Sequence, residues 1–278
     1  MATPTAPLTP QFIFQALNAY QQTAALQAAI ELDVFTGIGE GARTAQALAG
    51  RSRASERGMR ILCDYLVVTG LLTKEGDRYG LTPDAAAFLD RRSPACLASI
   101  VQFLSDPRLT DGFKDFAAAV RKGGTVLSPE GTLGPDNDLW VNFARNMVPM
   151  VAPAAEEIAA LIDAGAGHKW KVLDIAAGHG MFGVTIARHN PNAGIVALDW
   201  LNVLAVAREN AQAAGVAARF STLPGSAFDV DYGAGYHVAL LTNFLHHFDI
   251  PTNEGLLRKV CAALQPGGRA VTLEFVPN

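Results

Sequence analysis

The sequence has little that would suit a secreted or membrane-bound protein. Its three cysteines, Cys63, Cys96 and Cys261, are odd in number and widely scattered along 278 residues. This spacing suits neither a disulfide framework nor a zinc site, so we interpret them as reduced core residues. The first residues, 1–10, contain no basic residue and no apolar segment, and no run of about 20 apolar residues occurs. The sequence therefore predicts a cytoplasmic protein without a membrane span.

Charged residues are also scarce. They make up only 17% of the chain, and the net charge is −4 at pH 7. Proteins that bind nucleic acid or anionic membranes through their overall charge are usually basic, so we expect neither partner. Half of the residues are apolar, which is enough for a substantial core, and the length suits one large or two modest domains.

The most informative stretch is Lys171–Asp199, which reads as strand, glycine turn, helix and strand. Residues 172–175 are mostly apolar, as is typical of a buried parallel strand. Gly178 and Gly180 then allow the backbone to turn sharply and to approach a ligand closely. Asp199 ends the next apolar run. Because ligands of open parallel sheets bind beyond the carboxyl ends of the strands, we expect the binding site here.

Two kinds of cofactor match this stretch. Residues 178–183 fit the pattern G-x-G-x-x-G, and Asp199 follows about 20 residues later, where NAD-binding domains keep an acid for the ribose. Asp174, however, ends the first strand, where a buried carboxylate would repel a pyrophosphate and favour positive charge. S-adenosylmethionine (SAM) carries a sulfonium, an ammonium and no phosphate, and Asp199 could accept hydrogen bonds from its ribose hydroxyls. We favour SAM over NAD, and an ordinary turn with a capping aspartate is the other alternative.

Three motifs along the chain resemble those of class I SAM-dependent methyltransferases. Residues 172–180, Val-Leu-Asp-Ile-Ala-Ala-Gly-His-Gly, are similar to the first motif, and residues 264–269 resemble the turn before the fifth strand. Residues 245–249, Leu-His-His-Phe-Asp, resemble a segment of the O-methyltransferases of the plant caffeate and acetylserotonin type, which have bacterial members. The resemblance covers nearly the whole chain. It implies an α/β fold in which a winged-helix dimerisation domain, mostly helical, precedes a Rossmann-like methyltransferase sheet.

The N-terminal half supports this reading. Over residues 43–82, Thr44 and Ser55 can each cap a helix, and a hairpin is expected after Gly70. A DNA-binding module would present polar side chains on its second helix, whereas apolar residues cover much of this one. The resemblance instead implies dimerisation, and the first helix, residues 12–32, has a wide apolar surface that suits burial against another subunit.

We expect three segments along the chain. Residues 1–105 form the helical and winged-helix dimerisation domain, residues 106–164 form bridging helices and a loop, and residues 165–278 form the SAM-binding domain. Alternating strands and helices in the last segment imply a parallel sheet with right-handed crossovers. The chain stops just past the expected fifth strand. We therefore also expect that the C-terminal hairpin of the family's sheet is missing and that the chain is a fragment.

His246 is the candidate general base, because it follows the expected fourth strand and takes the place of the family's catalytic histidine. Methyl transfer to a hydroxyl requires removal of the proton, and a histidine with a pKa of about 6.5 can accept it. Glu274 matches an acidic position that flanks this histidine in the family and could orient its ring. The alternative for His246 is that it forms an exposed surface pair with His247. The alternative for Glu274 is a carboxylate that faces solvent. We expect no metal, because adjacent side chains on a turn diverge and no further ligand stands nearby.

The resemblance implies further binding residues. The expected cofactor-binding residues are Asp174, Ala176, Gly178, Gly180, Asp199, Trp200, Gly225, Ser226, Ala227, Phe228 and Asn243. The expected substrate-binding residues are Met147, Met150 and His247, although methionines are more often core filler. The chain departs from the family's pattern at five positions, one of which is Thr242 in place of a lysine before the catalytic segment. Ala176 replaces a glycine, Ser226 an aspartate, His247 an aspartate and Phe248 a tryptophan.

Together these features predict a homodimeric SAM-dependent O-methyltransferase. It would transfer a methyl group to a hydroxyl of a small aromatic or apolar molecule, with a histidine as general base. The alternatives are a carbon or nitrogen methyltransferase of the same fold, and a SAM-binding winged-helix regulator without turnover.

Overall fold

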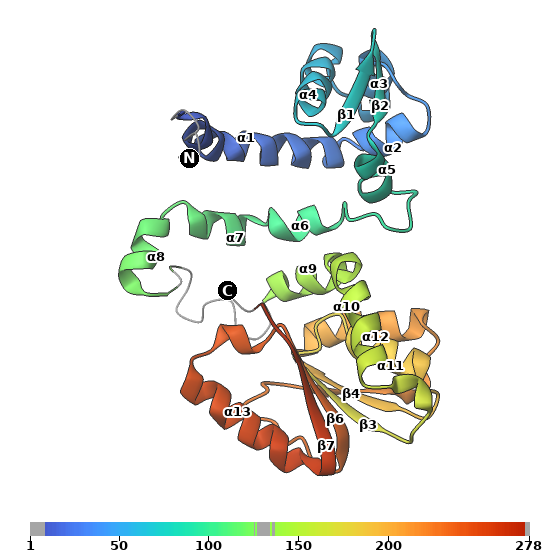
Figure 1. Ribbon diagram of the computed structural model, residues 1–278, viewed down its shortest axis with the longest axis vertical. Coiled ribbons are helices and arrows are strands. Elements are labelled where there is room, and N and C mark those ends of the chain that lie inside the picture. Colours follow the sequence, from blue (N-terminus) through green and yellow to red (C-terminus); the bar gives the residue numbers. More distant parts are fainter. Residues whose placement is uncertain (1–8, 125, 127–133, 135–136, 276–278) are drawn as a thin grey trace, which may run out of the picture. The chain divides into compact units, whose positions relative to one another are not determined.

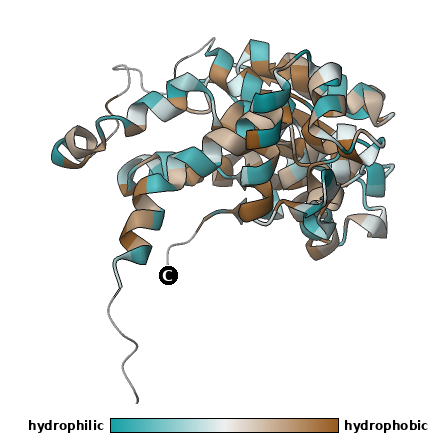
Figure 2. Cartoon of the chain, turned by 90° about the horizontal axis from the view of Figure 1, so that it is seen from above, coloured by the Kyte–Doolittle hydropathy of each residue, from teal (hydrophilic) through white to brown (hydrophobic). Residues whose placement is uncertain are grey.

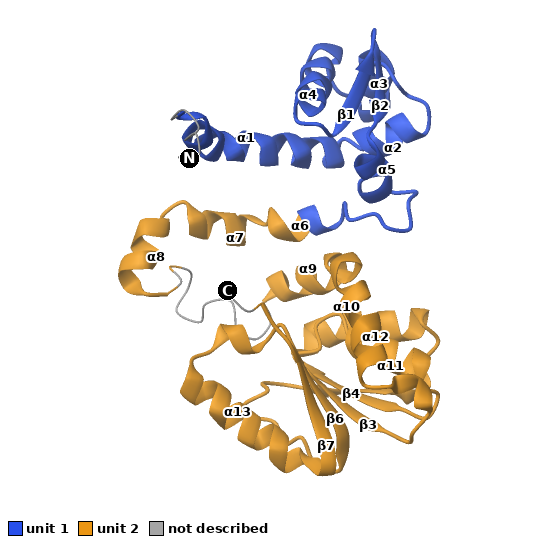
Figure 3. Ribbon diagram, in the orientation of Figure 1, with its two compact units in different colours: residues 1–101 blue, residues 102–278 orange. Residues whose placement is uncertain are grey.

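The computed structural model describes residues 9–124, 126, 134 and 137–275. The chain divides into two compact units, residues 1–101 and residues 102–278 (Figure 3). The expected bridging segment is therefore part of the second unit. Most of its expected loop lies outside the described residues, as do residues 276–278, next to which a missing hairpin was expected. Within the described part of the chain, no helix is both long and apolar enough to span a membrane.

The first unit is mostly helical and contains one hairpin. Its elements are α1 (Gln11–Glu31), α2 (Val34–Gly39), α3 (Ala45–Ser52), α4 (Glu56–Val68), β1 (Leu72–Glu75), β2 (Arg78–Leu81) and α5 (Pro83–Phe88). Both expected caps are present: the Thr44 hydroxyl accepts a hydrogen bond from Ala47 N at 3.2 Å, and the Ser55 hydroxyl accepts one from Gly58 N at 3.4 Å. β1 and β2 pair as the expected antiparallel hairpin.

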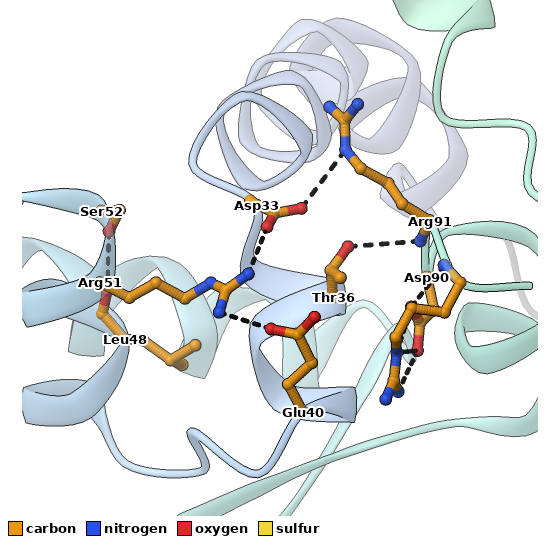
Figure 4. A network of polar contacts seen from close by, with 9 residues as sticks. Asp33, Thr36, Glu40, Leu48, Arg51, Ser52, Asp90 and Arg91 are labelled. Carbon is orange, nitrogen blue, oxygen red and sulfur yellow. Dashed lines mark hydrogen bonds and ion pairs between the residues drawn. The ribbon is translucent and has the colours of Figure 1, made fainter.

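A polar network connects α2 and α3 with the segment that follows α5 (Figure 4). Arg51 on α3 lies 2.9 Å from Asp33 and 2.5 Å from Glu40, which flank α2. Arg91 pairs with Asp33 at 3.3 Å, and its backbone N–H donates to the Thr36 hydroxyl. Since these ion pairs are partly exposed, each contributes little alone, and the network mainly orients the elements that surround the apolar core.

The three cysteines lie in different environments. Cys63 on α4 is fully buried in the core of the first unit, and burial raises the pKa of its thiol to about 12. Cys96 is partly exposed. Cys261 is exposed on α13 (Ile250–Ala263) of the second unit, so the expectation that all three are core residues is wrong for this one. The buried residues of α13 are instead Leu256, Val260 and Ala263.

The second unit contains a five-stranded parallel sheet in the order β5-β4-β3-β6-β7. The strands are β3 (Lys171–Ile175), β4 (Gly194–Asp199), β5 (Phe220–Pro224), β6 (Tyr236–Thr242) and β7 (Leu264–Leu273). The helices α10 (Val148–Leu161), α11 (Met181–His189) and α12 (Leu201–Ala213) lie on one side of the sheet, and α13 lies on the other (Figure 1). Before the sheet come α6 (Ile100–Leu104), α7 (Pro107–Thr110), α8 (Phe116–Lys122) and α9 (Asp138–Asn146).

Each face of the sheet has its own apolar core. Val172 on β3 packs in the cluster with α10 and α11, whereas the next residue, Leu173, packs in the cluster with α13. This alternation is expected, because successive side chains of a strand point to opposite faces. Hydrophobic and hydrophilic residues alternate along the helices, whose ribbons carry both brown and teal stretches (Figure 2). The expected Rossmann-like α/β sheet is confirmed.

The turn between β3 and α11 requires glycine at Gly180. Its φ is +70°, and a Cβ there would lie 2.9 Å from the Cβ of Ala207 on α12 and 3.1 Å from the ring of Phe220 on β5. Gly215, which follows α12, has a similar φ of +71° but has no atom within 4 Å of the same position. The two glycines therefore share a left-handed backbone and differ in the space around them.

We predict that Gly180→Ala destabilises the protein more than Gly215→Ala does. The left-handed backbone should cost about 1 kcal/mol of the free energy of unfolding in both variants, and crowding against Ala207 should cost about 1 to 3 kcal/mol more at Gly180. Urea denaturation of both variants checks this. Equal losses would contradict the close packing of this turn.

The first two thirds of α1 are exposed although many of the residues there are apolar. Every residue from 11 to 24 is exposed, and the exposed fraction is 78% for Phe12, 65% for Leu17 and 68% for Tyr20. An isolated helix gains little stability in water, and most helices are stabilised by packing of an apolar face. This segment therefore lacks the packing that usually stabilises a helix of its length.

We predict that the apolar face of α1 is buried in a homodimer. Light scattering at micromolar concentration should give twice the chain mass. Leu17→Glu should shift the population towards the monomer, because a charge would enter an apolar interface. Gln22→Glu adds the same charge to the same helix on its polar side, which also carries Gln15 and Asn18, and should leave the dimer intact. A monomeric wild-type protein would show this prediction to be wrong.

Candidate active site

Two cavities adjoin at the carboxyl ends of β3, β4 and β6. The larger measures about 340 Å³ and the smaller about 320 Å³, and both are lined by Asp199, Trp200, Ala176 and Phe244. Of the expected site residues, the larger cavity also contacts Met147, Met150, Gly178, Asn243, His246 and His247. The smaller cavity contacts Gly225, Ser226, Ala227 and Phe228. The expected residues Asp174, Gly180 and Glu274 line neither cavity.

Asp199 connects β4 to the glycine turn. Its Oδ2 accepts a hydrogen bond from Gly178 N at 2.8 Å, and its Oδ1 accepts one from Trp200 N at 2.7 Å. Burial raises the pKa of this carboxyl to about 6. A carboxylate can accept about four hydrogen bonds, so two sites remain for hydroxyl groups of a ligand in the adjoining cavities.

Asp174 lies deeper than expected. Its side chain is fully buried and shares the face of β3 that Val172 presents to α11, where Oδ2 accepts a hydrogen bond from Gly183 N at 3.1 Å. Its Oδ1 has no hydrogen-bond partner among the described residues, and burial raises the pKa of the carboxyl to about 7. The expectation that this carboxylate meets a charged ligand directly does not match its position. Asp174 instead fixes the start of α11, on which the glycine turn depends.

Ala176 has the backbone conformation of a glycine. Its φ is +52°, in the left-handed region, which costs a residue with a Cβ about 1–2 kcal/mol. The family's glycine at this position thus has a physical reason, and this chain adopts the same turn with alanine.

Glu274 organises the turn after β6. Its Oε1 accepts hydrogen bonds from Phe244 N at 2.8 Å and Leu245 N at 2.6 Å, and its Oε2 lies 2.7 Å from His246 Nδ1. Burial acts to raise the pKa of Glu274, but the bonds from His246, Leu245 and Phe244 outweigh it and lower the pKa. Because an ionised carboxylate only accepts, Nδ1 of His246 carries the proton and Nε2 is left with a lone pair.

His247 lies beside this pair in a more buried position. The ring centroids of His246 and His247 are 4.2 Å apart, and the His247 ring contacts Trp140 edge-on at 5.7 Å. Burial and then the proximity of His246 lower the pKa of His247, so its ring is neutral at physiological pH. Among the described residues, no group of three or more potential ligands could hold a metal ion.

Aromatic side chains form walls in both cavities. In the larger one, Phe143 on α9 meets Phe103 and Trp140 edge-on at 5.2 and 5.8 Å. In the smaller one, Phe248 meets Phe228 at 4.9 Å and lies near Phe244. Phe103, Trp140 and Phe143 were not among the expected site residues, because the sequence marks them only as aromatic residues in helical segments. These walls suit planar ligand groups.

His179 was also missed as a site residue, although it is part of the glycine turn. Its side chain lines the larger cavity with only 2% of its surface exposed. Its Nδ1 accepts a hydrogen bond from Met181 N at 3.1 Å. Burial lowers the pKa of this histidine to about 4, so the ring is uncharged. The signal in the sequence was the position itself, between two glycines of a ligand-binding turn.

Two family models match the chain. Residues 14–91 match the O-methyltransferase dimerisation domain, and residues 172–268 match a methyltransferase domain. A 3-hydroxy-5-methyl-1-naphthoate 3-O-methyltransferase of Streptomyces sahachiroi is 26% identical over 278 residues, which cover 99% of this chain and 79% of that enzyme.

Solved structures agree with these matches. A protein from Nostoc punctiforme, classed as an O-methyltransferase, is 49% identical, with a TM-score of 0.93 over 98% of this chain and 82% of that one. Human N-acetylserotonin methyltransferase in complex with SAM shares the fold at 21% identity, with a TM-score of 0.72 over 98% of this chain and 81% of that one. The chain therefore belongs to the SAM-dependent O-methyltransferases that carry an N-terminal dimerisation domain.

Proposed function

We propose that this enzyme methylates a hydroxyl group of a small aromatic molecule and that His246 is the general base. The observation that supports this most directly is the His246–Glu274 pair at the larger cavity, with 2.7 Å between Nδ1 and Oε2. Glu274 fixes the tautomer and orientation of the ring, so that Nε2 is free to accept a proton from a molecule in the cavity.

The two cavities fit SAM. No lysine or arginine is among the described residues that line them, which suits a cofactor without phosphate. We assign the ribose hydroxyls to Asp199 and the adenine to the smaller cavity, between Gly225 and the aromatic pair of Phe228 and Phe248. When bound, SAM supplies a methyl group that its sulfonium has already activated. Ala176 and Gly178 allow close approach of the cofactor to the backbone, and Asp174 acts only through the turn.

The residues of the chain then supply a general base and align the acceptor with the methyl group. Nε2 of His246 would accept the proton of the hydroxyl group, and the bound cofactor would supply the methyl group that takes the place of that proton on the oxygen. Glu274 stabilises the imidazolium that results, as the acid does in a catalytic triad. Such a base typically contributes about 10²–10⁴-fold to the rate. Alignment of the two reactants contributes much of the remainder.

The walls of the larger cavity favour an aromatic acceptor. Phe103, Trp140 and Phe143 offer ring faces and edges, and Met147 and Met150 offer adaptable apolar contacts. His247 provides a neutral polar group beside the base. The names of two relatives support such an acceptor: the Streptomyces sahachiroi enzyme is named a 3-O-methyltransferase of a hydroxynaphthoate, and a Streptomyces glaucescens protein is named an 8-O-methyl transferase of tetracenomycin polyketide synthesis.

We predict that His246→Ala lowers turnover by about 10²–10⁴-fold, because the variant has no base. Affinity for SAM, measured by calorimetry, should stay near the wild-type value, because this ring contacts the acceptor side. Glu274→Gln should cause a smaller loss, since the ring remains but its orientation and charge stabilisation weaken. Turnover is measured with labelled SAM and a panel of phenols.

His168→Ala is the matched control, because this histidine is exposed and lines neither cavity. Its turnover should equal that of the wild type. A His246→Ala variant with normal turnover would rule out this ring as the base.

We also predict that affinity for SAM falls as the pH drops below about 6. The pKa of Asp199 is raised to about 6. The carboxylate that accepts from the ribose is therefore ionised at neutral pH and becomes protonated as the pH falls through this value. Calorimetry between pH 5 and 8 measures the change. Asp199→Asn should bind SAM weakly, and its affinity should depend on pH less than that of the wild type. Unchanged wild-type affinity at pH 5 would contradict the assigned role of Asp199.

A further inference from the structure

The larger cavity has few groups that could bind a carboxylate. Its described lining is mostly aromatic and aliphatic and contains no lysine or arginine. SAM ends in an amino acid group whose carboxylate would lose its hydration there. Burying such a charge is costly unless hydrogen-bond donors replace the water. The cavity must therefore supply at least one well-placed donor.

The position of Asp199 indicates where that carboxylate lies. Asp199 lines both cavities and marks the ribose, and the smaller cavity leads from it to Phe228 and Phe248. If the adenine occupies the smaller cavity, the amino acid end extends the opposite way. It then crosses the turn of Gly178 and His179, since the methyl group must face His246. His179 is thus the side chain of the turn that the carboxylate would meet.

The neutral ring of His179 has one hydrogen-bond donor, and its bond with Met181 determines which nitrogen that is. Because its Nδ1 accepts the hydrogen bond from Met181 N, the proton of the neutral ring is on Nε2. Among the described residues, Nε2 has no hydrogen-bond partner, yet it is not one of the fully enclosed polar atoms that lack one. Since the ring lines the larger cavity and is 2% exposed, this N–H opens towards the cavity.

The surroundings keep this ring in place. The Phe143 ring lies nearly parallel to it at 5.9 Å, and the Phe182 ring lies at the same distance and is tilted. Asn210 Nδ2 donates to the carbonyl oxygen of His179 at 2.8 Å and fixes the backbone of the turn. A donor that is ordered before binding costs little conformational entropy when the ligand arrives.

We propose that the Nε2–H of His179 donates a hydrogen bond to the carboxylate of the cofactor's amino acid end. His179 is then a cofactor-binding residue within the glycine turn, which otherwise contacts ligands through its backbone. The proposal rests on the orientation of SAM in the proposed function. Because the ring remains neutral, it can bind the carboxylate without placing a second positive charge beside the sulfonium.

Two ligands separate this role from a structural one. S-adenosylhomocysteine contains the amino acid group, whereas 5′-methylthioadenosine has the same adenosine and lacks that group. In His179→Phe, affinity for S-adenosylhomocysteine should fall by about tenfold to a hundredfold, the range expected for one hydrogen bond to a charged group. Affinity for 5′-methylthioadenosine should not change. Both are measured by calorimetry on the full chain.

His179→Asn is the matched variant, because its amide can accept from Met181 N and still donate towards the cavity. It should recover part of the lost affinity for S-adenosylhomocysteine. Equal weakening of both ligands in His179→Phe would overturn the proposal, because the turn itself would then be distorted, and so would unchanged affinity for S-adenosylhomocysteine. Failure of every phenol to be methylated by a wild-type protein that binds S-adenosylhomocysteine would count against the proposed function alone.

Discussion

The pairing of β3 with β6 is the constraint on which the site depends. The two strands lie side by side at the centre of the sheet, with Val172 opposite Val238 and Ile175 opposite Leu241, although β4 and β5 come between them in the chain. The chain leaves β3 towards one edge and β6 towards the other, so the loops that follow diverge and leave a crevice between them. The glycine turn and the turn of His246 meet across this crevice.

Each turn is then fixed by a single carboxylate from a neighbouring strand. Asp199, at the end of β4, accepts a backbone hydrogen bond from the turn after β3, and Glu274, just past β7, accepts two from the turn after β6. Both carboxylates therefore have a structural and a chemical use. Their environments shift their pKa values in opposite directions. Burial raises the pKa of Asp199, whereas for Glu274 the effect of burial is outweighed by hydrogen bonds from His246 and two backbone N–H groups, which lower its pKa.

The sequence could predict what depends on local pattern. The caps at Thr44 and Ser55, the glycine turn and the acid at Asp199 each have a signal within a few residues, and the structure contains all of them. The contact of His246 with Glu274 could be predicted only from the resemblance to a family, because the two residues are 28 positions apart in the sequence.

What the sequence could not predict depends on tertiary packing. Asp174 was expected at the ligand, but the alternation of β3 turns its side chain towards α11, and a short apolar run does not show which face meets which layer. Phe143 and Trp140 reach the cavity only because α9 lies near the glycine turn. His179 is a similar case, since its tautomer depends on the bond to Met181 N.

The distribution of tryptophans gives the protein an optical property. It has three, of which Trp140 and Trp200 line the larger cavity, whereas Trp170 is buried in the core between the sheet and its helices. Indole emission is sensitive to the polarity around the ring and to nearby aromatic or charged groups. Two of the three emitters are therefore placed where a molecule that enters the cavity would displace water from their surfaces, and the third provides a constant background.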